Sequence, residues 1–187
     1  MLDLGEKKEM KSLPGQRSAK TQMASLLRVN HAGEYGAKRI YEGQLAILKG
    51  TPSEPLLMHM KEQEIGHLKS FEHLIVENRV RPTLLQPLWH IAGYALGVST
   101  ALMGEKAAMA CTAAVEEVID EHYERQLIRL GSENPALSHL IRTCQEEERE
   151  HRDLAFAHGA AEAVAYPLLS RTIKAGSRLA IWLSERL

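Results

Sequence analysis

The sequence of 187 residues is poor in cysteine and in aromatic residues, and it has almost no net charge. Its two cysteines, Cys111 and Cys144, are well separated in the chain. A disulfide framework, a cysteine-ligated zinc site or a rubredoxin-type iron site would need closely spaced pairs of cysteines. The sequence therefore excludes these three classes and indicates a reducing compartment.

Two further absences limit the partners and the destination of the protein. With 23 Lys+Arg against 24 Asp+Glu the formal net charge is −1, whereas a nucleic-acid-binding protein needs an excess of cationic side chains. The first residues contain neither the apolar run of a secretory signal nor the Arg-rich, acid-poor composition of a transit peptide. We therefore expect no nucleic-acid partner and a location on the cytoplasmic side.

The remaining composition, with 44% hydrophobic and 25% charged residues, is that of a globular protein with a substantial core. Apolar residues recur at helical spacing and strand patterns are weak, which predicts an all-α fold. Residues 1–17 combine charges with Pro14 and Gly15 and show no apolar period, so we expect a flexible N-terminal arm. Residues 18–187 are expected to form a single domain.

Turn signals rich in glycine, proline and serine divide this domain into helices. The expected helices are 18–49, 56–78, 105–130, 136–158 and a C-terminal amphipathic helix at 168–185, and an uncharged segment, 83–104, separates the second from the third. Short loops join the first two and the next two of these helices, so each pair is expected to form an antiparallel hairpin.

An internal repeat relates the two hairpins. Glu34 and Tyr41 recur as Glu116 and Tyr123 at an offset of 82 residues, and Glu62, Glu64 and His67 recur as Glu146, Glu148 and His151 at an offset of 84. A seven-residue spacing places the glutamate and the tyrosine within about 20° of each other on one helix face. Each Glu-x-x-His pair also shares a face. The sequence therefore predicts a pseudo-symmetric four-helix bundle made from a duplicated hairpin.

Four glutamates and two histidines facing the core of such a bundle are the signature of ferritin-like di-metal carboxylate proteins. Buried carboxylates repel one another unless protons or cations neutralise them, and two divalent ions would balance four. Mixed oxygen and imidazole ligands favour iron or manganese over structural zinc, and we take iron as the better candidate. The predicted ligands are Glu34, Glu64, His67, Glu116, Glu148 and His151. Glu64 and Glu148 are expected to bridge the metals, and each histidine to hold one ion.

Simpler interpretations of these residues exist. A single Glu-x-x-His on a helix is usually a solvated pair, and the run at 146–150 is by itself typical of an exposed charged face. The three ligand-type residues of the first half recur in register in the second, and this recurrence argues against these interpretations. Glu117 lies about 100° from Glu116 on the helix and breaks the register, so we expect it on another face.

Other polar residues near the predicted ligands have two interpretations each. Tyr41 and Tyr123 are either core residues or hydrogen-bond donors near the metals. His122 and Asp153 either orient ligands or are ordinary polar residues on the flank of a helix. The other six histidines are expected not to bind metal.

Five motifs carry a resemblance to a known family. They are residues 28–37 (RVNHAGEYGA), 63–69 (QEIGHLK), 108–117 (AMACTAAVEE), 148–153 (EREHRD) and 180–187 (AIWLSERL). Together they resemble the 5-demethoxyubiquinone hydroxylase family from about residue 22 to residue 187. The resemblance implies a ferritin-like di-iron monooxygenase of ubiquinone biosynthesis, with the same six ligands, and it places His122 and Tyr123 beside the iron.

The resemblance also implies a substrate, cofactors and partners. The substrate would be 2-polyprenyl-3-methyl-6-methoxy-1,4-benzoquinol, hydroxylated with O2 at the ring carbon that becomes 5-hydroxy. Two iron ions per chain would serve the reaction. An external reductant is needed because the sequence has no Gly-x-Gly-x-x-Gly element, and the family suggests NADH. The partners implied are a lipid-binding accessory protein in a biosynthetic complex and a second copy of the chain in a homodimer.

Two apolar segments suggest contact with a membrane surface. A spanning helix at 83–104 would put the two halves of the predicted site on opposite sides of the bilayer, so an interfacial or bundle-capping helix is expected. At 168–185, basic residues at helical spacing (Arg171, Lys174 and Arg178) suit a helix in a headgroup layer. The alternative is a helix docked on its own bundle or on a second protomer. We expect a peripheral protein on the cytoplasmic face of a bacterial membrane, or on the matrix side of the inner membrane in a mitochondrion.

Two other functions remain compatible with a helical bundle. A ferritin-like protein for iron oxidation and storage would share the carboxylates, but the uncharged segment 83–104 suits a polar multi-subunit shell poorly. A metal-free helical scaffold is disfavoured by the repeat.

Overall fold

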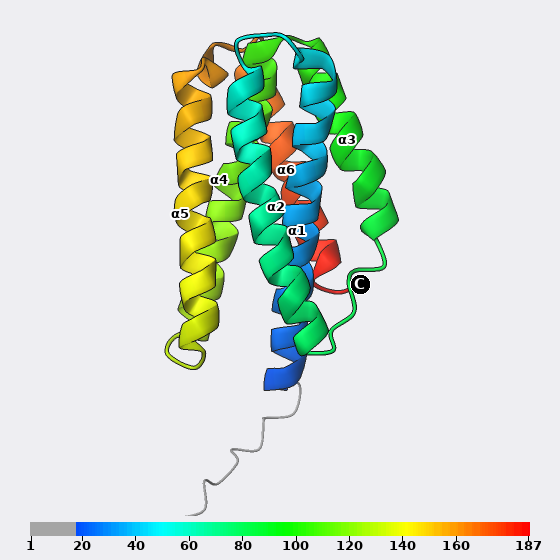
Figure 1. The fold of residues 1–187 in the computed structure, drawn as a ribbon, viewed down its shortest axis with the longest axis vertical. Coiled ribbons are helices and arrows are strands. Elements are labelled where there is room, and N and C mark those ends of the chain that lie inside the picture. Colours follow the sequence, from blue (N-terminus) through cyan, green and yellow to red (C-terminus); the bar gives the residue numbers. More distant parts are fainter. Residues whose placement is uncertain (1–17) are drawn as a thin grey trace, which may run out of the picture.

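The computed structural model describes residues 18–187, so the arm predicted at 1–17 lies outside the described residues. The helices are α1 (Ala19–Leu48), α2 (Glu54–Glu77), α3 (Gln86–Leu102), α4 (Glu105–Leu130), α5 (Pro135–Ala157) and α6 (Tyr166–Ser184), with a short 3-10 turn, η1 (Ala160–Glu162). The described part of the chain contains no strand, so the predicted all-α class is confirmed (Figure 1).

Local capping explains where the helices begin and end. The Ser18 hydroxyl accepts a hydrogen bond from the Thr21 backbone N–H at 3.2 Å at the start of α1, and the Asn134 side chain accepts one from the Leu137 N–H at 3.1 Å at the start of α5. Such caps satisfy backbone donors that have no partner in the first turn. Gly131, at a φ of 50°, ends α4. The observed helices therefore begin and end close to the predicted residues.

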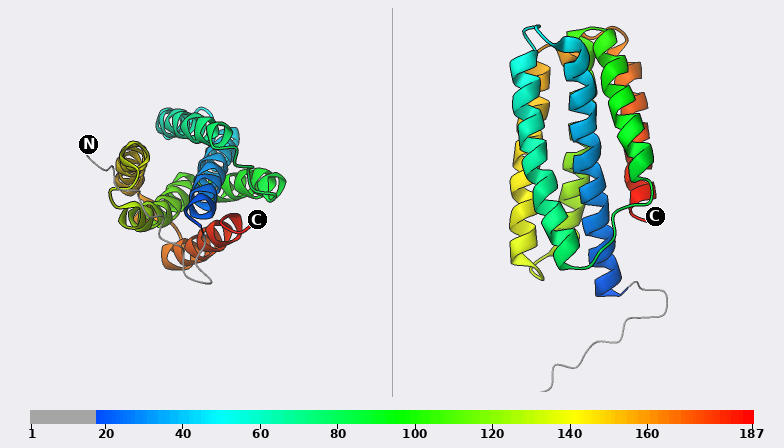
Figure 2. Two further views of the ribbon diagram at one scale, coloured as in Figure 1. Left: turned by 90° about the horizontal axis from the view of Figure 1, so that it is seen from below. Right: turned by 45° about the vertical axis from the view of Figure 1, so that its right-hand side comes forward.

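The four predicted bundle helices form two antiparallel hairpins, α1 with α2 and α4 with α5. Viewed along the bundle, α3 lies outside against α1 and α6 lies outside against α4 (Figure 2). Two apolar clusters lie within the four-helix bundle, and a third lies where α6 packs on α1 and α4. Of the two within the bundle, one includes Leu57, Met60 and Met109, and the other includes Phe71 and Ile141. The duplicated hairpin is thus present, with two additional helices on one side.

Helix α3 lies along α1 at very close range because glycines meet at the crossing. A Cβ atom built on Gly97 would lie 2.0 Å from the Ile40 carbonyl oxygen, and one built on Gly43 would lie 2.3 Å from the Tyr94 carbonyl oxygen. The uncharged segment therefore forms a helix along the side of the bundle and does not cap one of its ends. Among the helices described, none combines the length and the apolar character needed to cross a bilayer.

Helix α6 docks on its own bundle, as one of the two alternatives predicted. Ile173 is buried against α4, Lys174 pairs with Glu117, and Arg178 pairs with Glu121 at 3.1 Å. Two of the three basic residues expected to face lipid headgroups therefore bind acidic residues of α4. Part of the apolar surface of α6 still faces outward, at Leu168, Leu179 and Trp182, which are between 51% and 69% exposed.

Candidate metal centre

The six predicted ligands converge in the interior of the bundle. Glu34 comes from α1, Glu64 and His67 from α2, Glu116 from α4, and Glu148 and His151 from α5, and their exposed fractions lie between 0% and 6%. Glu34, Glu64, His67 and Glu148 form one group of potential ligand atoms within 4.8 Å of one another, and Glu64, Glu116, Glu148 and His151 form a second. Glu64 and Glu148 belong to both groups, which is the arrangement required of bridging carboxylates.

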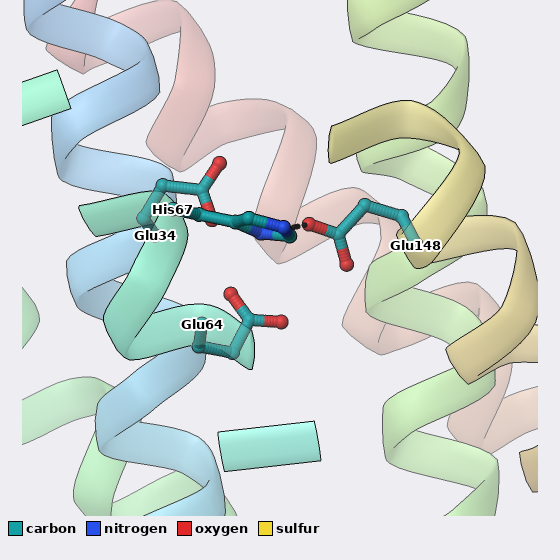
Figure 3. Close-up of side chains that lie close together, drawn as sticks. All are labelled: Glu34, Glu64, His67 and Glu148. Carbon is teal, nitrogen blue, oxygen red and sulfur yellow. Dashed lines mark ion pairs between the residues drawn. The ribbon is translucent and has the colours of Figure 1, made fainter. Parts of the chain in front are cut away.

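Both histidines direct the same ring nitrogen into the cluster. His67 Nδ1 lies 3.4 Å from Glu34 Oε2 and 3.2 Å from Glu148 Oε1, and Figure 3 shows these side chains pointing toward one another. His151 Nδ1 lies 3.4 Å from Glu64 Oε1 and 3.2 Å from Glu148 Oε2. Glu148 therefore lies between the two imidazoles and offers one oxygen to each.

The atoms that face the centre of the cluster have no hydrogen-bond partner among the described residues. They are Glu34 Oε2, both oxygens of Glu64, His67 Nδ1, Glu116 Oε2, both oxygens of Glu148 and His151 Nδ1. Buried polar atoms are normally hydrogen-bonded, and a group of unsatisfied atoms that point at one place needs an explanation. A pair of bound cations provides it, because each of these atoms is a potential metal ligand.

The outer oxygens of the two non-shared glutamates, in contrast, are hydrogen-bonded. The Tyr41 hydroxyl donates to Glu116 Oε1 at 2.8 Å, and the Tyr123 hydroxyl donates to Glu34 Oε1. Each tyrosine thus binds the glutamate of the other hairpin, and both phenols are buried. Of the two interpretations of these tyrosines, the structure shows hydrogen-bond donors to the predicted ligands.

The outer nitrogens of the two histidines contact residues that were not predicted as part of the site. His67 Nε2 lies 2.6 Å from Glu147 Oε2, and His151 Nε2 lies 2.9 Å from Gln63 Oε1. Partners of this kind hold a ligating imidazole in one orientation and one tautomer. Glu147 and Gln63 each reach across to the opposite hairpin, a relation that spacing along a single helix cannot reveal.

Electrostatics within the cluster favour its neutralisation by cations. Burial, reinforced by the nearby charge of Glu148, raises the pKa values of Glu64 and Glu116 well above the usual range. Burial would also raise the pKa of Glu148, but the imidazoles of His151 and His67, whose Nδ1 atoms each lie 3.2 Å from one of its oxygens, hold it at about 2. Burial would lower the pKa values of the two imidazoles, yet neighbouring side chains, with Glu148 prominent, raise both. Without metal the cluster therefore retains protons that bound cations would replace.

His122 and Asp153 lie away from the converging ligand atoms. His122 Nε2 accepts a hydrogen bond from the Gln126 amide at 2.7 Å, and that amide also donates to Asn30. Burial lowers the pKa of His122 to about 4, so this imidazole is neutral at neutral pH. Asp153 is exposed and pairs with Arg152 at 2.8 Å, which agrees with the ordinary polar interpretation.

Both cysteines are free and buried, which agrees with the exclusion of a disulfide framework. The Cys144 thiol lies against His67, and burial raises its pKa to about 11. The thiol is therefore neutral at neutral pH, and the cluster presents carboxylates and imidazoles. This donor set fits two divalent iron or manganese ions.

Comparison with known proteins assigns a family to this geometry. The family model described as "Ubiquinone biosynthesis protein COQ7" matches residues 21–184. A 3-demethoxyubiquinol 3-hydroxylase of Rhodospirillum rubrum is 53% identical over 183 residues, which cover 97% of this chain and 86% of the relative.

Eukaryotic relatives are similar over a comparable range. The mitochondrial NADPH-dependent 3-demethoxyubiquinone 3-hydroxylase of Homo sapiens is 51% identical, covering 87% of this chain and 76% of the relative. The mitochondrial 5-demethoxyubiquinone hydroxylase of Saccharomyces cerevisiae is 40% identical, covering 87% and 77%. The chain therefore belongs to the family of the ubiquinone biosynthesis protein COQ7.

Proposed function

We propose that this chain is a di-iron hydroxylase of ubiquinone biosynthesis that acts on demethoxyubiquinol. The observation that carries the proposal is the pair of ligand groups joined by Glu64 and Glu148, in a chain whose relatives are named as hydroxylases of this substrate. In the reaction, one atom of O2 enters the ring as a hydroxyl group. The other atom leaves as water, with two electrons and two protons supplied by the reductant.

The side chains divide into inner ligands and outer supports. Glu34 and His67 would hold one ion, Glu116 and His151 the other, and the two shared glutamates would lie between them. When bound, a pair of ferrous ions supplies two electrons to O2 at one site. Tyr41 and Tyr123 hold the outer oxygens of the terminal glutamates, so those carboxylates keep one oxygen directed inward.

The apolar clusters on both sides of the site suit O2 and a hydrophobic quinol. Leu57 and Met60 close one side, and Phe71 and Ile141 close the other, and all four are 0% exposed. Exclusion of water protects reactive species from side reactions and strengthens electrostatic interactions within the site. These water-excluding surroundings support the proposed hydroxylation.

The reductant is external to the chain. The names of the mammalian relatives specify NADPH, whereas the family resemblance suggested NADH. We propose a reduced nicotinamide nucleotide as the donor, and turnover with each of the two under otherwise equal conditions identifies the one used.

The substrate reaches the site from a membrane surface. Helices α3 and α6 are linked near the C-terminal end of α6, where the Trp89 indole N–H donates to Ser184 Oγ at 2.9 Å. Their outer faces expose apolar side chains, namely Leu88 and Ile91 of α3 and Leu168, Leu179 and Trp182 of α6. An exposed apolar surface of this kind suits the boundary between headgroups and acyl chains. We propose peripheral binding, at the cytoplasmic face in a bacterium or the matrix side of the inner membrane in a mitochondrion.

The same apolar surface is available to protein partners. A second copy of the chain, or a lipid-binding accessory protein, would cover part of it and assist transfer of a polyprenyl quinol. Measurement of the mass of the purified protein, with and without detergent, tests the homodimer directly.

A single-turnover experiment tests the proposed activity. Protein loaded anaerobically with ferrous iron is mixed with a short-tailed demethoxyubiquinol and 18O2, and the product is analysed by mass spectrometry. We expect two irons per chain and a product that carries one 18O atom. Oxidation of many equivalents of ferrous iron without oxygen transfer would instead indicate storage. Absence of stoichiometric metal would contradict the di-iron site.

A further inference from the structure

The two histidines of the candidate metal centre have outer partners of different charge. His67 Nε2 faces the Glu147 carboxylate at 2.6 Å, and His151 Nε2 faces the Gln63 amide oxygen at 2.9 Å. Because Nδ1 of each ring points into the cluster, a metal bound there fixes the proton on Nε2. Each Nε2–H then donates, to a carboxylate in one case and to a neutral amide in the other.

Gln63 and Glu147 occupy the same position in the repeat. Each directly precedes a shared glutamate, in Glu62-Gln63-Glu64 and in Glu146-Glu147-Glu148, and the offset between them is the 84 residues that relates His67 to His151. Each also reaches across the bundle to the histidine of the other hairpin. The duplication has therefore preserved the contact and changed its charge.

The other supports of the site are alike in the two halves. Each terminal glutamate accepts a hydrogen bond from a tyrosine of the opposite hairpin. Each imidazole lies 3.2 Å from an oxygen of Glu148. Cys144 lies against His67 only, and a thiol is a weak hydrogen-bonding group. Among these contacts, the two halves therefore differ in charge at the residue that accepts from Nε2, which is Glu147 in one half and Gln63 in the other.

A carboxylate acceptor increases the electron donation of a ligating imidazole, whereas a neutral amide does so weakly. We infer that Glu147 and Gln63 make the two metal positions unequal. The position formed by Glu34 and His67 binds its ion more tightly and favours the higher oxidation state. The position formed by Glu116 and His151 binds its ion more weakly. This inference rests on the proposed di-iron function and adds to it an order of loading and oxidation. Glu147 and Gln63 are positioning residues that act through the histidines.

Stepwise metal binding tests the inference without reference to activity. Metal-free protein is titrated anaerobically with ferrous iron against a chromophoric chelator, and the two dissociation constants are measured. We expect unequal steps in the natural chain. Glu147→Gln should weaken the tighter step by about 10- to 100-fold, the usual effect of losing such a partner, and leave two similar steps. Gln63→Glu should tighten the weaker step, and the double exchange should restore unequal steps.

Mössbauer spectra of the iron-loaded protein report the environment of each iron ion. A substitution that only lowered the stability of the fold would not change these spectra. We expect two resolved ferrous doublets in the natural chain, and doublets that converge in Glu147→Gln. Glu146→Gln is the matched control, because Glu146 is exposed on the same helix and its substitution removes the same charge. We expect this control to leave both dissociation constants and both doublets unchanged.

The outcomes separate the inference from the proposed function. Two equal steps in the natural chain, or a difference that survives Glu147→Gln, would overturn the inference while leaving a di-iron enzyme. Equal effects of Glu146→Gln and Glu147→Gln would also overturn it, because net charge and not the hydrogen bond would then be responsible. Failure of the natural chain to bind two ions would overturn the proposed function, and the inference with it.

Discussion

At the scale of single residues, the hydrogen bonds around the site cross from one hairpin to the other. Tyr123 of α4 binds Glu34 of α1, and Tyr41 of α1 binds Glu116 of α4. A carboxylate whose outer oxygen is held by a donor can turn only its other oxygen toward a metal. We therefore expect the tyrosines to fix the orientation of these two candidate ligands.

Replacement of Tyr123 by phenylalanine tests this role. Tyr123→Phe keeps the buried ring and removes the donor to Glu34, so we expect a normal helical content and metal binding weakened by about 10-fold or more. Circular dichroism and chelator competition measure the two quantities. The control is Tyr35→Phe, which removes a hydroxyl that binds His90 at the surface and should leave metal affinity unchanged. Equal effects of the two substitutions would contradict the assignment.

Metal binding should depend on pH with a definite sign. The pKa values of Glu64 and Glu116 are raised by burial and neighbouring charge, so these groups hold protons in the metal-free protein. Binding must displace them, and affinity should therefore rise with pH. Calorimetry in two buffers of different ionisation enthalpy, at about pH 7, measures the number of protons released. Release of no protons would show that the cluster is already ionised without metal.

The same pKa shifts predict the stability of the metal-free protein. A glutamate whose pKa is raised in the folded state contributes stability that is fully present below its ordinary value and is lost as pH rises through the raised value. We therefore expect the free energy of unfolding of the metal-free protein to fall as pH rises above about 5, and bound metal to reduce this dependence. Urea denaturation at several pH values, with metal and with chelator, measures both curves.

The convergence of the six candidate ligands was predictable from sequence because a metal centre on helices needs fixed spacings, and the duplication displayed those spacings twice. Glu34 and Glu116 stand out only through the repeat, since neither belongs to a Glu-x-x-His pair. The contacts of Glu147 and Gln63 were not predictable, because they depend on which helices face each other across the core. The pairing of Lys174 with Glu117 escaped prediction for the same reason.

At the scale of helices, the crossing of α3 and α1 depends on glycine. The Cβ position of Gly97 lies 2.0 Å from the backbone oxygen of Ile40, and neither helix backbone can move aside without separating the pair. The apolar character of the segment was visible in the sequence, but its place against α1 was not, since isolated glycines in a helix have no preferred partner.

Gly97→Ala should force α3 away from α1. We expect a loss of about 1–3 kcal/mol in the free energy of unfolding, the usual cost of overpacking. Gly66→Ala is the control, since a Cβ there meets no atom within 4 Å, and alanine in an exposed helical position should raise stability by up to about 1 kcal/mol. Chemical denaturation compares the two variants with the natural chain, and a neutral Gly97→Ala would contradict the tight crossing.

At the scale of the whole molecule, α3 and α6 lie outside the four-helix bundle, against α1 and α4 respectively (Figure 2), and both expose apolar side chains. Replacement of Leu88, Ile91, Leu179 and Trp182 by serine or glutamine should leave the buried core intact and reduce co-sedimentation with anionic liposomes several-fold. Activity toward a water-soluble short-tailed quinol should be retained, while activity toward a long-tailed quinol in vesicles falls. Unchanged binding to vesicles would reject this surface as the membrane contact.

The two hairpins are held together differently on their two sides. Helix α6 contacts both α4 and α1 and so bridges the hairpins on one side, whereas α2 and α5 meet directly at few residues and no other helix bridges them in the described structure. These two helices nevertheless carry four of the six candidate ligands, Glu64, His67, Glu148 and His151. Bound metal would therefore join the hairpins where their backbones make few close approaches.

Hydrogen exchange with and without metal tests this consequence of the topology. A ligand that binds only the folded state stabilises that state, and the ions would join α2 to α5. We therefore expect removal of metal to increase the exchange of backbone amide hydrogens mainly in these two helices. Exchange in α1 and α3, which pack closely through glycine, should change little. Glu148→Gln should resemble chelation even when metal is supplied, because it removes a ligand shared by both ions. A uniform increase in exchange over all helices would show instead that metal stabilises the bundle only as a whole.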